Sequence, residues 1–254
     1  MATTLRDYIR QVNYTLDRNL TRGVKWLVLI NIAVFLVEAL LFVPLAIDDV
    51  FVRIFAQNPI IRYEELPAGA VGMTINWLSV TQFFTYMFVH ASPWHLFMNM
   101  LALWFFGPPM EARWGSPAFL KFYLFTGFMA GALHGMLAPF FIGHNYVMMG
   151  ASGAIFGVLL AFGIYYPHER VLLWFVLPIP ARLFVILIGV FTFLSLCGGH
   201  EVGISHVTHL AGLAFGYAWI RLREVFPMFW LFNGDPRPFA RQFRRSGGFR
   251  SRFG

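Results

Sequence analysis

Residues 149–166 read MGASGAIFGVLLAFGIYY, and this stretch decides how the rest of the chain is interpreted. It contains no charged residue and is long enough for about one bilayer crossing as a helix. A helix is expected because unpaired backbone groups are intolerable in lipid. Gly153 and Gly157 are four residues apart, which gives the helix a face of small residues that a neighbouring helix can approach closely. Ser152 lies at the start of that face.

Five further apolar stretches have a similar length, at residues 26–47, 90–108, 117–139, 182–199 and 205–222. The composition agrees with spans in a membrane. Of the 254 residues, 58% are hydrophobic and only 12% are charged, whereas a soluble domain has about 25% charged residues. This excludes a disordered chain, a nucleic-acid-binding module and an ordinary soluble enzyme. We predict an all-α membrane protein with six transmembrane helices and a long outer first loop at residues 48–89.

The basic residues predict how these spans are oriented. With six spans both termini face one side, and that side carries every Lys and Arg except Arg53 and Arg62. Basic residues are retained in the cytoplasm, so both termini are expected there. The chain then divides into an N-terminal tail (1–25), a six-span domain (26–222) and a basic, aromatic C-terminal tail (223–254). The N-terminal tail has no transit-peptide character, which favours a bacterial inner membrane.

Two polar residues near the outer ends of different spans indicate a reactive site, because polar groups are rare at that depth. Ser152 opens the fourth span, and His209 lies at a matching depth in the sixth. Gly212 and Gly216 repeat the four-residue spacing, so the two glycine faces can bring Ser152 and His209 together. A histidine beside a serine is the minimal pair of general base and nucleophile. Taken singly, each motif is equally compatible with helix packing or a structural histidine.

A third polar group lies at the outer end of the second span. His95 and Asn99 are four residues apart and share one helix face, where both can donate hydrogen bonds to an oxyanion. His90 lies at least one turn nearer the outside. The alternative is that these histidines bind zinc, but the chain has no His-Glu-x-x-His motif and no carboxylate near that face. We expect neither a metal nor another cofactor.

The three groups follow one another on the second, fourth and sixth spans, and in this order they resemble the rhomboid intramembrane serine proteases. The matching motifs are His95-x-x-x-Asn99, Gly150-Ala151-Ser152-Gly153 and His209-x-x-Gly212-x-x-x-Gly216. The long first loop is also similar, as is the stretch Glu111-Ala112-Arg113-Trp114-Gly115. The resemblance covers residues 24–222, which is nearly all of the hydrophobic part.

The resemblance implies that Ser152 is the nucleophile and His209 the general base of a dyad. Phe156 stands where many rhomboids have a tyrosine that stacks on the catalytic histidine, and its ring can stack in the same way. The backbone N–H of Ser152 and the side chains of His95 and Asn99 would form the oxyanion hole. Close helix packing near the site is expected at Gly150, Gly153, Gly157, Gly212 and Gly216.

The implied partners are the lipid bilayer and the transmembrane segments of other proteins, which would be the substrates; no nucleic acid is expected. The main alternative is an inactive rhomboid-like protein that binds membrane proteins or acts in their quality control. Such proteins typically lack the serine or the histidine, and both are present here. A transporter or channel is a second alternative, but it would place charges at the membrane midplane, and Glu38 is the one acid within a span.

The remaining polar and aromatic residues are interpreted as structural. Glu111 and Arg113 are expected to form an ion pair or a loop tie at the cytoplasmic end of the second span. His134 is expected to make a packing hydrogen bond. Three histidines are expected at the outer surface: His144, His200 and His206. Four aromatic residues are expected to hold the first loop in the membrane interface: Trp77, Phe83, Phe84 and Tyr86.

Overall fold

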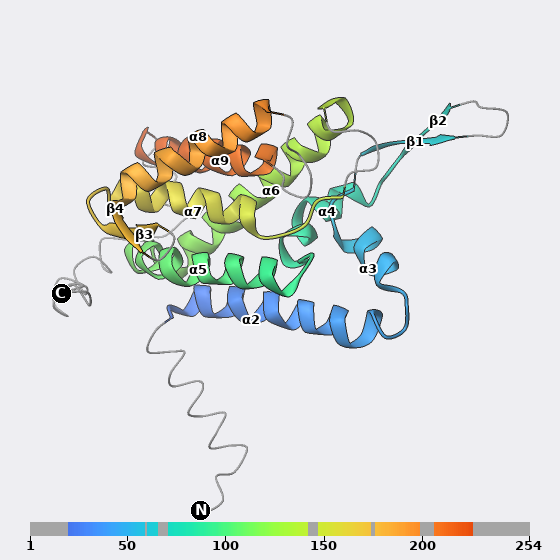
Figure 1. Cartoon of the computed structure of the whole chain (residues 1–254), viewed down its shortest axis with the longest axis horizontal. Coiled ribbons are helices and arrows are strands. Elements are labelled where there is room, and N and C mark those ends of the chain that lie inside the picture. Colours follow the sequence, from blue (N-terminus) through green and yellow to red (C-terminus); the bar gives the residue numbers. More distant parts are fainter. Residues whose placement is uncertain are drawn as a thin grey trace, which may run out of the picture.

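The computed structural model describes residues 20–58, 60–65, 71–141, 147–173, 176–198 and 206–225. The N-terminal tail up to residue 19 and the tail from residue 226 lie outside these ranges, as do His144 and His200. The described part is a bundle of long helices that run roughly side by side (Figure 1).

Within the described residues, a long helix overlaps each of the six predicted spans. These helices are α2 (Arg22–Val37), α5 (Pro93–Trp114), α6 (Ser116–Phe141), α7 (Ser152–Tyr165), α8 (Ala181–Cys197) and α9 (His206–Val225). Helix α2 continues into a π-helical turn, Glu38–Phe42. Helix α7 is central, because it packs against α5, α6, α8 and α9 and most of its residues are buried. That each of these helices crosses a bilayer stays a prediction.

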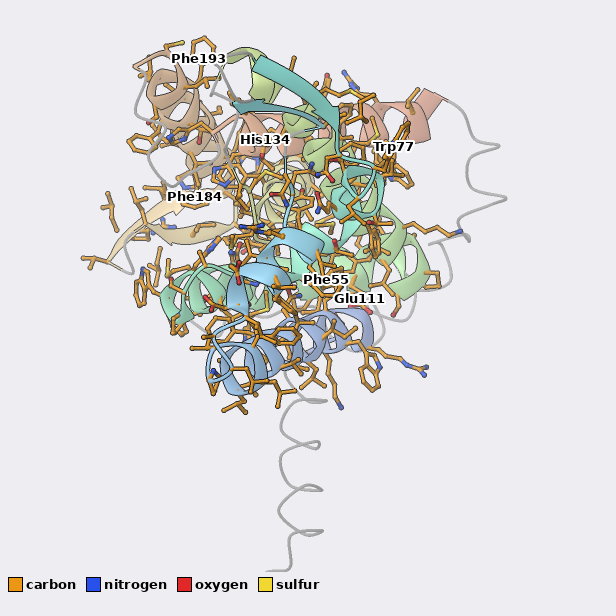
Figure 2. The ribbon with its side chains drawn as sticks, turned by 90° about the vertical axis from the view of Figure 1, so that its right-hand side faces the viewer. Phe55, Trp77, Glu111, His134, Phe184 and Phe193 are labelled. Carbon is orange, nitrogen blue, oxygen red and sulfur yellow. The ribbon has the colours of Figure 1, made fainter. Side chains whose placement is uncertain are left out.

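The outer surface of the bundle is strongly apolar. On α8, the side chains of Phe191, Phe193 and Leu194 are 54% to 68% exposed, and Phe193 lies at the edge of the bundle in Figure 2. Soluble monomers rarely expose so continuous an apolar face, whereas lipid tails would cover it. Among the described residues, one continuous helix, Arg22–Phe42, is both long and apolar enough to span a bilayer. Ser152–Tyr165 and Ala181–Cys197 are apolar but shorter.

The first loop contains regular structure that its sequence did not predict. Its elements are helix α3 (Asp48–Phe55), strands β1 (Ile61–Glu65) and β2 (Val71–Ile75), and helix α4 (Ser79–Thr85), which a 3₁₀ turn (Tyr86–Phe88) follows. The strands pair antiparallel with Ile61 opposite Ile75. Figure 1 shows this hairpin extending away from the end of the bundle.

The prediction that all four aromatic residues of this loop lie in the interface is wrong for two of them. Trp77 is 78% exposed, but Phe83 and Tyr86 are buried. Phe83 lies on α4, which packs against α6, and Tyr86 lies in the 3₁₀ turn that follows α4. The hydroxyl of Tyr86 donates a hydrogen bond to the carbonyl oxygen of Gly127 on α6, at 2.7 Å.

The apolar stretch between α7 and α8 is too short to span and forms a second antiparallel hairpin. Strand β3 (Arg170–Leu173) pairs with β4 (Leu177–Pro180), with Val171 opposite Ile179. The hairpin is tied to the start of α8, because the N–H of Ala181 donates to the carbonyl oxygen of Glu169 at 2.8 Å.

Helix α5 runs past the predicted end of the second span and includes Pro108 and Pro109. This extension carries Glu111, which is buried between α5 and the start of α2 (Figure 2). Its carboxylate accepts hydrogen bonds from the N–H groups of Gly23 at 2.6 Å and Val24 at 2.8 Å. The Thr21 and Ser116 hydroxyls donate to it as well. A carboxylate at a helix N-terminus accepts hydrogen bonds from N–H groups that have no partner within the helix. Its negative charge also interacts favourably with the positive end of the helix dipole.

Glu111 therefore ties the second long helix to the first. Arg113 makes a different contact, because its guanidinium lies 4.4 Å from the ring centre of Tyr165 at the end of α7. Of the two interpretations offered for these residues, the loop tie describes the contacts of Glu111.

Glu111→Ala should lower the free energy of unfolding by several kcal/mol. The substitution leaves buried donors at the start of α2 unpaired, and each such donor costs about 1–3 kcal/mol. Chemical or thermal unfolding in detergent micelles would measure the loss. Glu169→Ala is the matched control, because Glu169 is exposed. Equal stability of the two variants would contradict a structural role for the Glu111 carboxylate.

Candidate active site

Ser152 is the first residue of α7, and His209 lies in the first turn of α9. These two helices pack closely against each other. The Nε2 atom of His209 is 2.8 Å from the Oγ atom of Ser152, which is hydrogen-bond distance. The serine and the histidine therefore meet at corresponding ends of two adjacent helices.

Glycines on both helices make this approach possible. A β-carbon on Gly212 would lie 2.1 Å from the carbonyl oxygen of Gly153. One turn further, a β-carbon on Gly216 would lie 3.0 Å from the Cα atom of Gly157. The backbones of α7 and α9 are thus in direct contact, a separation that small residues permit and larger ones prevent.

The ring of Phe156 is stacked on the imidazole of His209. The ring centres are 4.1 Å apart and the planes differ by 7°. Phe156 is itself buried, and it lies one helical turn after Ser152 on the same face of α7. A fixed aromatic ring on this side restricts the rotation of the imidazole and keeps Nε2 directed at the serine.

His206 lies inside the protein, so the expectation that it is at the outer surface is wrong. Its side chain is 5% exposed, and its ring centre is 6.4 Å from that of His209. Because His206 precedes His209 by three residues on one helix, the two share a face that is directed into the bundle.

His95 and Asn99 border the other side of the serine. A β-carbon on Gly150 would lie 2.7 Å from Nε2 of His95 and 3.7 Å from Nδ2 of Asn99. Gly150 has a φ of 114°, a backbone conformation that residues with a β-carbon rarely adopt. The chain therefore turns tightly against the two side chains before α7 begins at Ser152.

The start of α5 fixes where His95 stands. Pro93 is at the first helical position, and the Ser92 hydroxyl accepts a hydrogen bond from the His95 N–H at 3.1 Å. Both are common at helix starts, where backbone donors lack partners. The ring of His90, a buried residue, packs edge-on against the His95 ring at 5.2 Å.

The segment before the serine is held by the first loop, a contact that the sequence did not reveal. Gln57 and Met148 exchange two backbone hydrogen bonds of 2.8 and 2.9 Å. The N–H of Gly150 donates to the carbonyl oxygen of Tyr86 at 2.9 Å. These are main-chain contacts between distant parts of the chain, and no side-chain motif marks them.

The chemistry available here is that of a neutral base and an adjacent hydroxyl, with further hydrogen-bond donors nearby. Within the described residues, no group of three or more His, Cys, Asp or Glu side chains could hold a metal ion. A serine activated by a histidine, with amide and imidazole donors beside it, is suited to acyl transfer.

The chain is similar in sequence to known proteins. Residues 78–224 match the family model of the rhomboid domain. Rhomboid protein 1, mitochondrial, from Saccharomyces cerevisiae is 35% identical over 143 residues, which are 54% of this chain and 41% of the relative. RHOMBOID-like protein 12, mitochondrial, from Arabidopsis thaliana is 31% identical over 160 residues, 55% of this chain and 46% of the relative. Rhomboid protease GluP from Bacillus subtilis is 34% identical over 130 residues, which are 51% of this chain and 23% of the relative. The chain thus spans less than half the length of these relatives.

Gly212→Ala should destabilise the protein severely, because its new methyl group would overlap the carbonyl oxygen of Gly153, a backbone atom that side-chain rotation cannot move. Overpacking a core typically costs about 1–3 kcal/mol even where side chains can adjust. Gly189→Ala on α8 is the matched control, because its methyl group would meet only Leu213, at an ordinary 3.4 Å. The melting temperatures of the two purified variants would be compared. If the two variants have the same melting temperature, the backbone contact between α7 and α9 is not as close as described.

Proposed function

Because the chain belongs to the rhomboid family, we propose that it is an intramembrane serine endopeptidase that uses Ser152 and His209 as a catalytic dyad. The observation that carries the proposal is the 2.8 Å separation of His209 Nε2 and Ser152 Oγ. The family match and the relatives named as rhomboid proteases support the same reaction class.

In the proposed reaction, Oγ of Ser152 attacks the scissile carbonyl carbon while Nε2 of His209 takes the hydroxyl proton. The His209 imidazolium then gives that proton to the departing amine, and an acyl-enzyme remains. His209 next deprotonates a water molecule that attacks the ester, and the returned proton regenerates the Ser152 hydroxyl. Both halves of the reaction use the same pair of atoms, and no cofactor takes part.

The negative charge on the substrate oxygen needs donors in each tetrahedral intermediate. We propose that the backbone N–H of Ser152 and the side chains of His95 and Asn99 supply them. The position of the His95 ring and the Asn99 amide beside Gly150, two residues before the nucleophile, supports this assignment. In a site that excludes bulk water, such donors stabilise charge strongly because they need no reorganisation.

The dyad has to hold its base without the carboxylate of a triad. We propose that Phe156 takes over the orienting part of that role, because its ring lies flat against the His209 imidazole. A carboxylate would also stabilise the imidazolium, and stacking replaces that effect only in part.

We propose that the substrates are transmembrane segments of other membrane proteins. Peptide carbonyls in a helix are engaged in hydrogen bonds, so such a segment must unwind locally before Ser152 can attack. The small residues around the nucleophile, Gly150 and Ala151, leave room for a substrate backbone with small side chains. The predicted topology would put the site near the outer face, with the termini in the cytoplasm. The relatives include mitochondrial proteins as well as a bacterial one, so family membership alone does not select the bacterial inner membrane.

Replacement of either dyad residue should abolish proteolysis. In vesicles with a single-span model substrate, Ser152→Ala and His209→Ala should each reduce cleavage by at least about 10⁴-fold, since the members of such a unit fail together. Thr81→Ala is the control, because it removes an exposed hydroxyl on α4. A fluorophosphonate should label Ser152 only when His209 is intact. Cleavage by Ser152→Ala at the parental rate would exclude the protease proposal.

Asn99→Ala should lower kcat by about 10²–10³-fold, the usual effect of removing one oxyanion donor. KM should change little, because this donor acts on charge that develops only in the transition state. Steady-state kinetics in vesicles would separate the two constants, and an unchanged melting temperature would show that the helix start is intact. A change confined to KM would assign Asn99 to substrate binding instead.

A further inference from the structure

The hairpin of β3 and β4 has two apolar faces, and among the described residues only one of them is covered. On the inner face, Ile179 is buried and Val171 packs against the main core. On the outer face, Leu172 is 47% exposed. At the tip, Val176 is 81% and Leu177 56% exposed. A two-stranded hairpin with this much exposed apolar surface needs an apolar or interfacial medium around it.

The hairpin projects across the helices. In Figure 2 the bundle is viewed roughly along its helices, and the sand-coloured hairpin beside Phe184 extends sideways from it. Its base is fixed by two backbone hydrogen bonds to the start of α8, from Ala181 to Glu169 at 2.8 Å and from Arg182 to Pro167 at 3.3 Å. If the helices cross a membrane, a projection perpendicular to them runs parallel to the membrane surface.

Positive charge surrounds the base of the hairpin. Arg170 begins β3, Arg182 follows β4 by two residues, and both side chains are exposed. The Arg113 guanidinium lies over the rings of Tyr165 and Tyr166, four to five residues before β3 in the chain. Glu169, which is also exposed, is the acid next to Arg170. The three arginines outnumber this acid and leave the base of the hairpin basic.

The hairpin carries its apolar tip away from the arginines at its base. Leu173 is three residues beyond Arg170, and a strand rises about 3.3 Å per residue, so the far end of β3 lies roughly 10 Å from Arg170. Interfacial segments bury their apolar side to a depth of about 5–10 Å while their basic residues remain among the headgroups. Because the hairpin runs parallel to the membrane surface, this separation is lateral. The exposed tip reaches the lipid beside the bundle, and the exposed arginines stay at the level of the headgroups.

We propose that the β3–β4 hairpin is a membrane-surface anchor for anionic lipid. Its tip, Val176 and Leu177, enters the boundary between headgroups and acyl chains, and Arg170 and Arg182 bind the headgroup phosphates. The anchor holds the first residues of α8 at a fixed depth, because the hairpin base is bonded to them. The proposal rests on the membrane location of the family and is independent of the catalytic role of Ser152.

An environment-sensitive fluorophore at the tip tests the insertion. Val176→Cys would be labelled with nitrobenzoxadiazole in a Cys197→Ser background, since Cys197 is the chain's one cysteine and is exposed. The full chain would be placed in phosphatidylglycerol vesicles, and Glu169→Cys would serve as the matched control at the hairpin base. The tip label should be quenched by a nitroxide on the upper acyl chain and protected from aqueous iodide. The base label should show the opposite pattern. Equal iodide quenching at both positions would overturn the proposal.

The role of charge is tested by removing it. The Arg170→Gln/Arg182→Gln double variant should shift the tip label towards water, with about a fivefold weaker docking equilibrium per arginine in phosphatidylglycerol. The parent in pure phosphatidylcholine should shift in the same direction. Identical quenching in both lipids would overturn the assignment of anionic lipid. A tip protected in native membranes but open in pure-lipid vesicles would mean that a protein covers it. Thermal unfolding of each variant would verify that the fold is retained.

Discussion

The contact between the backbones of α7 and α9 is the constraint on which the rest of the site depends. Gly212 leaves no room for a β-carbon against the carbonyl oxygen of Gly153, and one turn further a β-carbon on Gly216 would lie 3.0 Å from the Cα atom of Gly157. Ser152 and His209 stand at the adjoining ends of these helices, so the separation of the backbones sets the separation of the two side chains. Any residue that pushed the helices apart would lengthen the hydrogen bond between them.

Two further ties hold the surrounding elements against this pair. The first loop reaches the segment before Ser152 through the main chain of Gln57 and Tyr86. At the opposite end, Glu111 satisfies the donors at the start of α2. Both ties use groups that would be costly if left unpaired where water is scarce. The same low polarity that makes such contacts necessary also makes them strong.

The proposed chemistry requires no formal charge in the resting site. A neutral serine, histidine and asparagine can be buried with hydrogen bonds alone, whereas an ionised carboxylate would need a compensating partner. Arg113, over Tyr165, and the exposed Arg170 lie at the other end of α7 from Ser152. Proteolysis and attachment to the membrane surface would thus occupy opposite ends of one helical framework, joined by α7 and α8.

The sequence by itself determined the helical class, the approximate extent of the six helices and the spacing that lets Ser152 meet His209. The length of an apolar stretch and the three- to four-residue spacing of its glycines and polar residues are local properties. They do not depend on how the rest of the chain packs. The sequence misjudged Phe83, Tyr86 and His206, which are buried, and it gave no sign of the pairing between Gln57 and Met148. Whether such residues are buried depends on which distant segment packs over them, and main-chain hydrogen bonds leave no residue signature. Phe83 is buried because α4 packs against α6, and the main chain of Gln57 pairs with that of Met148 just before α7.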